Sequence, residues 1–292
     1  MWSIRRARGQ VSYVDVAVIV LTKNEEVNLP HALKSVCGWA KQVVVFDSFS
    51  TDGTESVARD FGAQFVQHRF EDYSKQRNAA LEGLSLAGLW TLFLDADEQV
   101  TPELKREIET AIGRSDVDGF ELALKFVWRG AWVRRGYYRT AYKTALFRTG
   151  RARCDDRGVN EHILVDGRVG RLDEPIHHED HRGLDAWLRK HVDYARREAS
   201  RAQDERLPPL SELTGTHAQR KNWIRFHLWQ RMPPALRASA LFGKRMIFDL
   251  AFLDGPEAVE YHFLQALWFQ LVVGAFEAEN AQRALERDDS NA

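Results

Sequence analysis

Residues 93–100, FLDADEQV, decide the fold of this chain, because an apolar run ends there in two carboxylates, Asp95 and Asp97. Such a run predicts a buried parallel strand, and open α/β sheets bind ligands just beyond the carboxyl ends of their strands. Mg²⁺ and Mn²⁺ prefer oxygen ligands and commonly take one or two carboxylates together with substrate phosphates. The spacing therefore indicates a site for a divalent ion and a nucleotide diphosphate. Taken alone, these residues also fit an acidic turn before a helix that begins at Thr101-Pro102-Glu103.

Strand and helix patterns alternate upstream of this stretch. Residues 14–21, VDVAVIVL, form a β-branched apolar run, and a polar loop and a helical pattern at 29–36 follow. A second apolar run at 42–46 and a short third strand at 64–67 precede a helical stretch at 74–86. Four strands that alternate with helices predict a parallel sheet.

The loop after the second strand, residues 47–54, reads DSFSTDGT. Asp47 follows the strand directly, so a further carboxylate is expected at the edge of the sheet where Asp95 and Asp97 lie. Asp52 and Glu55 have the spacing of a capping box, which predicts that Asp52 begins the next helix.

Three stretches in this order carry a family resemblance: VAVIVLTKNEEVNLPHALKSV, VVVFDSFSTDGTESVARDFGA, and the pair KQRNAAL and WTLFLDADEQVTPEL. They resemble the family 2 glycosyltransferases, nucleotide-sugar-dependent enzymes, and most of all the branch with the bacterial lipopolysaccharide core beta-glucosyltransferases. The resemblance covers roughly residues 14–180. It implies an α/β, GT-A fold: a Rossmann-like mixed sheet flanked by helices, here with a helical carboxyl-terminal extension. Phe49 departs from the pattern, because such enzymes usually have glycine at this position.

The resemblance assigns residues to the nucleotide. It implies that Thr22, Asn24 and Glu25 belong to the loop that borders the nucleotide. Asp47 is the carboxylate expected to hydrogen-bond the base, which favours a UDP-sugar as donor. From the residues alone, Asp47 can also be a turn former at the strand end.

The same resemblance assigns the diphosphate and the metal. Arg77 would approach the diphosphate with its planar fork of donors, although an exposed helix arginine is the alternative. Asp97 is expected to bind Mn²⁺ or Mg²⁺ directly, while Asp95 would bind ribose or a water molecule around the ion.

Transfer also requires a carboxylate that accepts the proton of the attacking hydroxyl. The stretch 154–162, CDDRGVNEH, offers three candidates. We expect Glu161 to be the general base, because the resembling branch often has Val-His-Glu here and Glu161 keeps the carboxylate although Asn160 replaces the histidine. Asp155 and Asp156 stay as alternatives, and Glu161 can also simply cap a helix or pair with an arginine.

Residues 175–181, PIHHEDH, form a dense group of possible metal ligands. In several GT-A enzymes a histidine after the main sheet completes the metal shell, and we expect His178, rather than His177, to do so. Together with His162 the group also permits a zinc site, which keeps a metal-dependent hydrolase as an alternative. No H-E-x-x-H or paired-cysteine spacing accompanies it.

The formal net charge of −1 over 292 residues hides an uneven distribution. Residues 125–157 contain ten Lys or Arg and two acidic residues, a patch that can meet acceptor phosphates or an anionic membrane, or simply be a solvated face. No nucleic-acid motif accompanies it, so no nucleic-acid partner is expected. Two distant cysteines, no signal core after the basic residues 1–10, and no apolar stretch of ~18 residues predict a cytoplasmic protein.

The last third of the chain changes character. A charged helical stretch at 184–206 ends at a Leu-Pro-Pro break, and residues 221–280 then combine aromatic, aliphatic and basic residues at helical spacing. We therefore predict a catalytic domain at 14–206 and a helical extension at 207–292. The extension either packs on protein or lies in a membrane interface, which would make the protein peripheral at the inner face of the cytoplasmic membrane.

The sequence thus predicts an inverting, metal-dependent transferase that moves a hexose from a nucleotide diphosphate sugar to a glycan or lipid-linked acceptor in envelope or lipopolysaccharide synthesis. Transfer to polyprenyl phosphate, a metal-dependent hydrolase and a non-catalytic sugar-nucleotide-binding module are the alternatives. The oligomeric state stays open.

Overall fold

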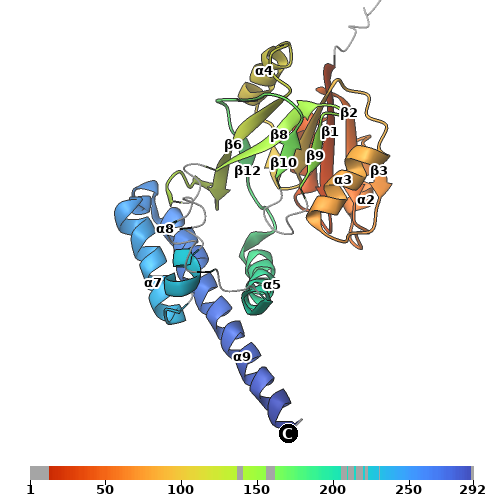
Figure 1. Ribbon diagram of the computed structural model, residues 1–292. Coiled ribbons are helices and arrows are strands. Elements are labelled where there is room, and N and C mark those ends of the chain that lie inside the picture. The colour runs from red at the N-terminus through yellow and green to blue at the C-terminus, as the bar shows by residue number, and fades with distance from the viewer. Residues whose placement is uncertain are drawn as a thin grey trace, which may run out of the picture. The chain divides into compact units, whose positions relative to one another are not determined.

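The computed structural model describes residues 13–136, 141–155, 162–204, 223–229 and 231–290, together with 209, 214 and 220. The strands in this part of the chain are β1 (Val14–Thr22), β2 (Ala40–Asp47), β3 (Gln64–Gln67), β4 (Trp90–Asp95), β5 (Glu98–Gln99), β6 (Gly119–Trp128), β7 (Ala131–Trp132), β8 (Tyr142–Arg148), β9 (Ala152–Cys154), β10 (Ile163–Val165), β11 (Val169–Arg171) and β12 (Ile176–His178). The helices are α1 (Leu29–Val36), α2 (Thr54–Asp60), α3 (Tyr73–Gly83), α4 (Pro102–Ala111), α5 (Gly183–Asp204), α7 (Pro234–Gly243), α8 (Pro256–His262) and α9 (Phe269–Ser290), with shorter segments η3 (Arg225–Trp229), η4 (Lys244–Phe248), η5 (Ala251–Asp254) and η6 (Phe263–Trp268) (Figure 1).

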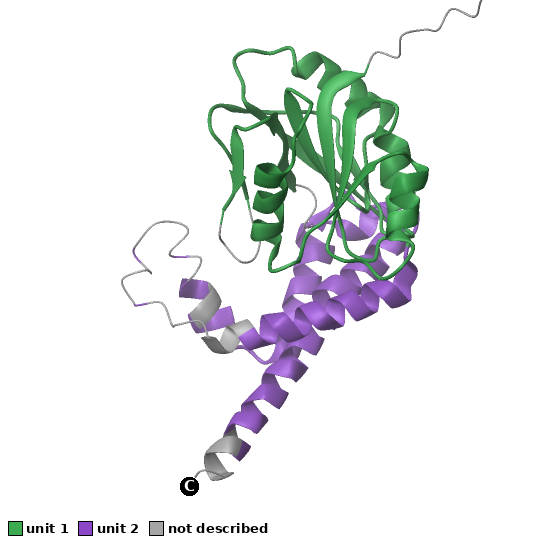
Figure 2. Cartoon of the chain, turned by 90° about the vertical axis from the view of Figure 1, so that its right-hand side faces the viewer, with its two compact units in different colours: residues 1–127, 140–181 green, residues 128–139, 182–292 purple. Residues whose placement is uncertain are grey.

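The chain forms two compact units (Figure 2). The first contains residues 1–127 and 140–181, and the second contains residues 128–139 and 182–292. The second unit thus groups α5 with the later helices, whereas the domain limits predicted from the sequence, 14–206 and 207–292, stay a prediction.

A mixed sheet forms the centre of the first unit, in the order β3-β2-β1-β4-β8-β6-β12-β5. Its first four strands are parallel, as the alternation of strands and helices predicts. From β4 onward the sheet becomes mixed, because β8 is antiparallel to both β4 and β6. The α/β fold class predicted from the sequence is confirmed.

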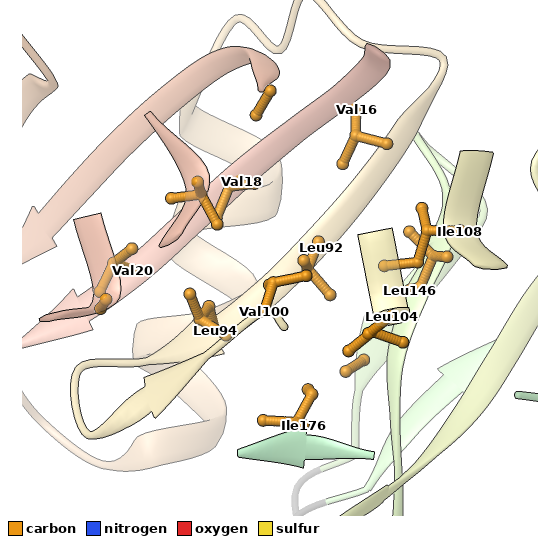
Figure 3. Packing of buried hydrophobic residues seen from close by; sticks show 14 of the residues in the cluster. Val16, Val18, Val20, Leu92, Leu94, Val100, Leu104, Ile108, Leu146 and Ile176 are labelled. Carbon is orange, nitrogen blue, oxygen red and sulfur yellow. The ribbon is translucent and has the colours of Figure 1, made fainter. Parts of the chain in front are cut away.

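Strand β1 is buried on both faces, which explains why its sequence is a continuous apolar run rather than an alternating one. Val16, Val18 and Val20 belong to one core cluster together with residues of β4 and of the flanking helices (Figure 3). Ile19 points to the other face and packs in a second cluster with Phe93. The two clusters hold the carboxyl ends of β1 and β4 side by side.

Helix α2 begins differently from the prediction. Its N-cap is Gly53, which makes no side-chain cap, so the capping box predicted from Asp52 and Glu55 is wrong. The carboxylate of Asp52 accepts instead from the backbone N–H of Thr54 at 3.1 Å, and Glu55 pairs with Arg59 one turn later. Asp52 therefore forms hydrogen bonds where the loop meets the first residue of the helix.

The second unit is built from helices around an aromatic cluster. The ring of Trp187 on α5 lies 5.3 Å from that of Trp128, 6.3 Å from that of Tyr261 and 6.1 Å from that of Trp268. Part of the aromatic pattern therefore serves as core, because aromatic pairs at these distances stabilise packing. Within the described part of the chain, no helix combines the length and the hydropathy needed to cross a membrane.

Candidate functional site

The carboxylates of the D-x-D stretch lie at the carboxyl end of β4, as the sequence predicts. Asp95 is the last residue of β4, and its backbone N–H donates to the Glu98 carboxylate at 2.9 Å. The Glu98 side chain is 1 % exposed, so it forms the floor of this acidic turn. Helix α4 follows with Thr101 as its N-cap, which confirms the expected helix start. The acidic turn therefore lies at the carboxyl edge of the sheet and also leads into helix α4.

His178 joins this turn from a distant part of the chain. Strand β12 pairs with β5 and sets His178 opposite Glu98. The imidazole Nε2 lies 3.6 Å from the Asp97 carboxylate, and Nδ1 lies 3.7 Å from that of Glu98. Burial alone would lower the pKa of His178, but these two carboxylates outweigh it and raise the pKa to about 9. The structure therefore brings together Asp97 and His178, the two residues predicted as metal ligands, whereas His177 pairs with Glu179 at 3.1 Å.

Two cations face Asp95. Arg77 of α3 lies 3.3 Å from one carboxylate oxygen, and Lys143 of β8 lies 3.0 Å from the other. Burial alone would raise the pKa of Asp95, yet Lys143 and Arg77 hold it well below its ordinary value. Burial would likewise lower the pKa of Lys143, and the charges of Asp95 and Glu98 raise it instead. The resemblance predicts that Arg77 binds the diphosphate and that Asp95 binds ribose or a water molecule around the ion. In the structure these two side chains contact each other.

The donor set suits a hard divalent cation. Carboxylates with one imidazole are acceptable ligands for Mn²⁺, and substrate phosphates usually complete such a shell. Among the residues that the structure describes, no group of three or more His, Cys, Asp and Glu side chains is arranged to hold a metal ion by itself. Asp97 and His178 thus fit a partial shell, which oxygens from a substrate would have to complete.

Asp47 lies fully buried at the end of β2, next to the carboxyl end of β1. One carboxylate oxygen accepts from the hydroxyl of Thr22 at 2.8 Å, and the other accepts from the backbone N–H of Ser50 at 2.8 Å and from the amide of Gln67 at 3.3 Å. The Ser50 hydroxyl adds a further hydrogen bond. Asp47 therefore organises the loop that follows it, and the predicted contact with the base stays a prediction.

Asn24 and Glu25 connect the loop after β1 to the loop after β2. The side-chain oxygen of Asn24, whose φ is 55°, accepts from the backbone N–H of Thr51 at 2.8 Å. The backbone N–H of Glu25 donates to the hydroxyl of Thr54 at 2.9 Å. Asparagine tolerates this left-handed conformation better than most residues. Both loops form one hydrogen-bonded rim at the carboxyl edge of the sheet.

Phe49 occupies this rim with a φ of 59°, the left-handed region that glycine adopts freely. The Lys23 ammonium holds the loop by donating to the carbonyls of Ser48 at 3.0 Å and Phe49 at 2.6 Å. The Phe49 side chain itself is 52 % exposed. The structure thus keeps the conformation that glycine favours at this position and places an aromatic residue in it.

We expect Phe49→Gly to raise the free energy of unfolding by about 0.5–1 kcal/mol, because it removes left-handed strain and little packing. Phe61→Gly is the matched control: Phe61 is 36 % exposed and has an ordinary φ of −84°, so its replacement should lower stability. Urea unfolding of the two variants checks this, and equal losses in both would show that the Phe49 backbone is not strained.

The expected base, Glu161, lies outside the described residues, as does its competitor Asp156. The described residues on either side of this segment make hydrogen bonds. Cys154 donates its N–H to Asn78 of α3 at 2.7 Å, and the carbonyl of Asp155 accepts from the Ser74 hydroxyl at 2.6 Å. Beyond the segment, β10 pairs with β9. Cys154 and Asp155, which precede the segment, therefore contact α3, the helix that carries Arg77.

Asn28 is a structural residue that the sequence did not single out. It is fully buried, and its amide nitrogen donates to Glu25 at 2.8 Å and to Asp180 at 3.0 Å, while its oxygen accepts from the N–H of His181. Asn28 thereby connects the loop after β1 to the segment after His178. An asparagine in an N-E-E-x-N loop gives no local signal of this pairing, because Asp180 and His181 lie 152 and 153 positions away.

Comparison with known proteins gives a family match for residues 17–159, most of which lie in the first unit. Residues 17–159 match the family model described as "Glycosyl transferase family 2". An uncharacterized glycosyltransferase of Rickettsia typhi is 31 % identical over 118 residues, which are 39 % of this chain and 40 % of that protein. The lipopolysaccharide core biosynthesis glycosyltransferase LpsC of Rhizobium meliloti is 27 % identical over 53 % of this chain and 59 % of its own length. The matches span less than two thirds of these relatives.

Solved structures resemble this chain at lower sequence identity. TarS of S. aureus in complex with UDP-GlcNAc is 16 % identical, with a TM-score of 0.44 and 91 % of each chain covered. Glucosyl-3-phosphoglycerate synthase of Mycobacterium tuberculosis, in complex with Mn²⁺, UDP and glucosyl-3-phosphoglycerate, is 20 % identical over 44 % of this chain and 51 % of that one, with a TM-score of 0.31. The family match and the mixed sheet with flanking helices confirm the resemblance: the chain belongs to the family 2 glycosyltransferases and has their GT-A fold.

Proposed function

We propose that this protein is an inverting, metal-dependent glycosyltransferase that moves a hexose from a nucleotide diphosphate sugar, most simply a UDP-sugar, to a glycan or lipid-linked acceptor in lipopolysaccharide or other envelope synthesis. The observation that carries the proposal is the meeting of Asp95, Asp97 and His178 with the cations Arg77 and Lys143 at one sheet edge. Carboxylates and cations in this arrangement suit a metal-bound diphosphate. The relative LpsC, named for lipopolysaccharide core biosynthesis, supports the acceptor class.

Each residue then has a defined task. Asp97 and His178 would hold the metal, which, when bound, neutralises the leaving diphosphate. Arg77 would direct its guanidinium to phosphate oxygens, and Thr22, Asn24, Glu25 and Asp47 would shape the pocket of the nucleoside, with Asp95 near the ribose. The acceptor hydroxyl attacks the anomeric carbon, its proton passes to Glu161, and the bond from that carbon to the diphosphate oxygen breaks. A single displacement of this kind inverts the anomeric centre.

Calorimetric binding of UDP, with and without Mn²⁺, tests the donor site. We expect binding that requires Mn²⁺ and that Asp97→Ala abolishes. No binding by the wild-type protein under either condition would contradict a UDP-sugar donor. Cleavage of the donor separates the rival classes: a transferase cleaves efficiently only with an acceptor, a hydrolase needs none, and a binding module cleaves nothing.

We further infer a peripheral membrane contact at the cytoplasmic face, through a segment that we call the apolar turn. It consists of five large apolar side chains with exposures of 67, 79, 45, 51 and 55 %: Ile247, Phe248, Leu250, Phe252 and Leu253. Leu250 has a φ of 54°, a conformation that costs leucine about 1–2 kcal/mol and still exposes it. Arg134 borders the turn, because its backbone N–H donates to Asp254 at 2.8 Å and its guanidinium lies 4.4 Å from the ring of the half-exposed Trp132. Apolar anchors beside an arginine and a tryptophan suit an anionic lipid interface.

Replacement of two anchors should release the protein from lipid. We expect Phe248→Ser with Leu253→Ser to weaken partitioning onto vesicles of anionic phospholipid at least tenfold, since burial of one such side chain contributes roughly 1.5–3 kcal/mol. Leu89→Ser is the control, because Leu89 is 67 % exposed but belongs to the first unit. Vesicle flotation measures this. Unchanged flotation together with lost self-association in light scattering would assign the apolar turn to a second copy of the chain instead.

A further inference from the structure

Lys143 is brought to the acidic turn by strand β8. Strand β8 runs antiparallel to β4 and pairs Leu146 with Leu92. The pairing of these two strands ends there, while Lys143 pairs with Leu122 of β6 on the other side of β8. Lys143 is therefore carried by a strand of the sheet rather than by a loop, and its ammonium reaches the Asp95 carboxylate at 3.0 Å.

The Lys143 ammonium lies between two carboxylates. It is 3.0 Å from an oxygen of Asp95 and 2.6 Å from an oxygen of Glu98, and that same Glu98 oxygen accepts the backbone N–H of Asp95. The Lys143 side chain is 25 % exposed and that of Glu98 is 1 % exposed, so the pair is little screened by solvent. A carboxylate so deeply buried as Glu98 is strongly unfavourable without a cation beside it. Lys143 supplies this cation.

The second cation at Asp95 is held differently. The Arg77 guanidinium lies over the ring of Phe93 at 5.3 Å and its side chain is 14 % exposed, so packing fixes it in place. A lysine, by contrast, carries a compact charge on a flexible stem. Of these two groups, Lys143 is the one that can withdraw from Asp95 without a change in the helix or sheet that carries it.

We propose that Lys143 is an internal counterion that neutralises Asp95 and Glu98 and thereby competes with a divalent cation at the neighbouring Asp97, so that the metal binds tightly only when the Lys143 ammonium withdraws. This rests on the proposed function, since it assumes the metal to bind at Asp97. The consequence is that the protein alone binds metal weakly. Donor phosphates supply further oxygen ligands and a new partner for the ammonium, and therefore make displacement favourable. We therefore expect the metal and the donor to bind cooperatively, so that each raises the affinity of the protein for the other.

Metal binding by the full chain without nucleotide tests this competition. We expect Lys143→Gln to bind Mn²⁺ at least about tenfold more tightly than wild type, equivalent to about 1.4 kcal/mol, in calorimetry or by the loss of the free-ion paramagnetic resonance signal. The matched control is Lys41→Gln, which makes the same charge change. Lys41 pairs with Asp15 at 2.7 Å and lies near the start of β2, away from its carboxyl end, so its replacement should leave Mn²⁺ affinity unchanged. Equal or weaker Mn²⁺ binding by Lys143→Gln overturns the proposal.

A second measurement covers the case in which Lys143→Gln folds poorly, because it removes the nearer of the two cations beside the buried Glu98. Mn²⁺ should then raise the melting temperature of Lys143→Gln more than that of wild type, and Lys143→Arg, which keeps the charge, should respond like wild type. A melting temperature of Lys143→Gln that Mn²⁺ does not raise contradicts the competition. If wild type binds UDP with Mn²⁺ but Lys143→Gln gains no affinity for the metal, only this inference fails. Absence of UDP binding to wild type would instead remove the proposed function.

Discussion

Asp97→Asn is expected to lower donor turnover by at least about a thousandfold, because the amide keeps the size of the side chain and removes the charge that a divalent cation requires. The Asp97 side chain is 13 % exposed and lies 3.6 Å from Nε2 of His178, so its oxygens face the turn rather than bulk solvent. Release of UDP from UDP-sugars, with membrane glycolipid extract as acceptor and Mn²⁺ present, measures the effect. Asp185→Asn, at an exposed carboxylate of α5, should retain full turnover.

The loss must arise from metal binding and not from unfolding. We therefore expect Asp97→Asn to melt within a few degrees of wild type while it no longer binds UDP in an Mn²⁺-dependent way. A variant that folds, binds no metal and still turns over at the wild-type rate would remove the D-x-D stretch from the mechanism. In that event the cations Arg77 and Lys143 would be the remaining groups able to neutralise the diphosphate.

The parallel half of the sheet was predictable because its signals are local. Strand β1 is buried on both faces, so its residues 16–21 are continuously apolar, and β3 begins and ends at the residues that its short run predicts, 64–67. The prediction of Thr101 as a helix cap succeeded for the same reason, since a cap, a proline and an acidic residue follow one another in the chain. Where a competing contact comes from elsewhere, the local pattern failed. The N-cap of α2 is Gly53 rather than Asp52, whose carboxylate also accepts the N–H of Glu26 in the loop after β1, and Glu55 pairs with Arg59.

The contacts between distant segments were not predictable in their geometry. His178 could be proposed as a ligand by resemblance, but its place opposite Glu98 follows from the pairing of β12 with β5. Lys143 is one of ten basic residues in a patch, and the place of β8 beside β4 in the sheet brings it to Asp95. An antiparallel strand can pair in any register that buries its apolar face, so the sequence alone does not fix which polar residues meet.

Asp47→Ala should have the largest effect on stability among the predicted site residues, a loss of about 3 kcal/mol in the free energy of unfolding. The buried carboxylate accepts from Thr22, Ser50 and Gln67, and removing it leaves their donors without a partner where water has little access. Urea unfolding measures the loss. Asp15→Ala is the matched control at the opposite end of the sheet: its carboxylate pairs with Lys41 but is 37 % exposed, so at most about 1 kcal/mol is expected.

Two further variants separate the roles of Asp47 in the loop and in nucleotide binding. Gln67→Ala removes one of the hydrogen bonds at a residue without a proposed nucleotide contact and should cost at most about 1 kcal/mol, with Mn²⁺-dependent UDP affinity nearly unchanged. Asp47→Asn keeps the shape but turns an amide toward at least one donor, so it should lose both stability and UDP affinity. If Asp47→Asn loses stability and keeps its UDP affinity, the carboxylate serves the loop alone and the base is recognised elsewhere. If Asp47→Asn loses much more UDP affinity than its loss of stability accounts for, the Asp47 carboxylate contacts the base in addition to holding Ser50.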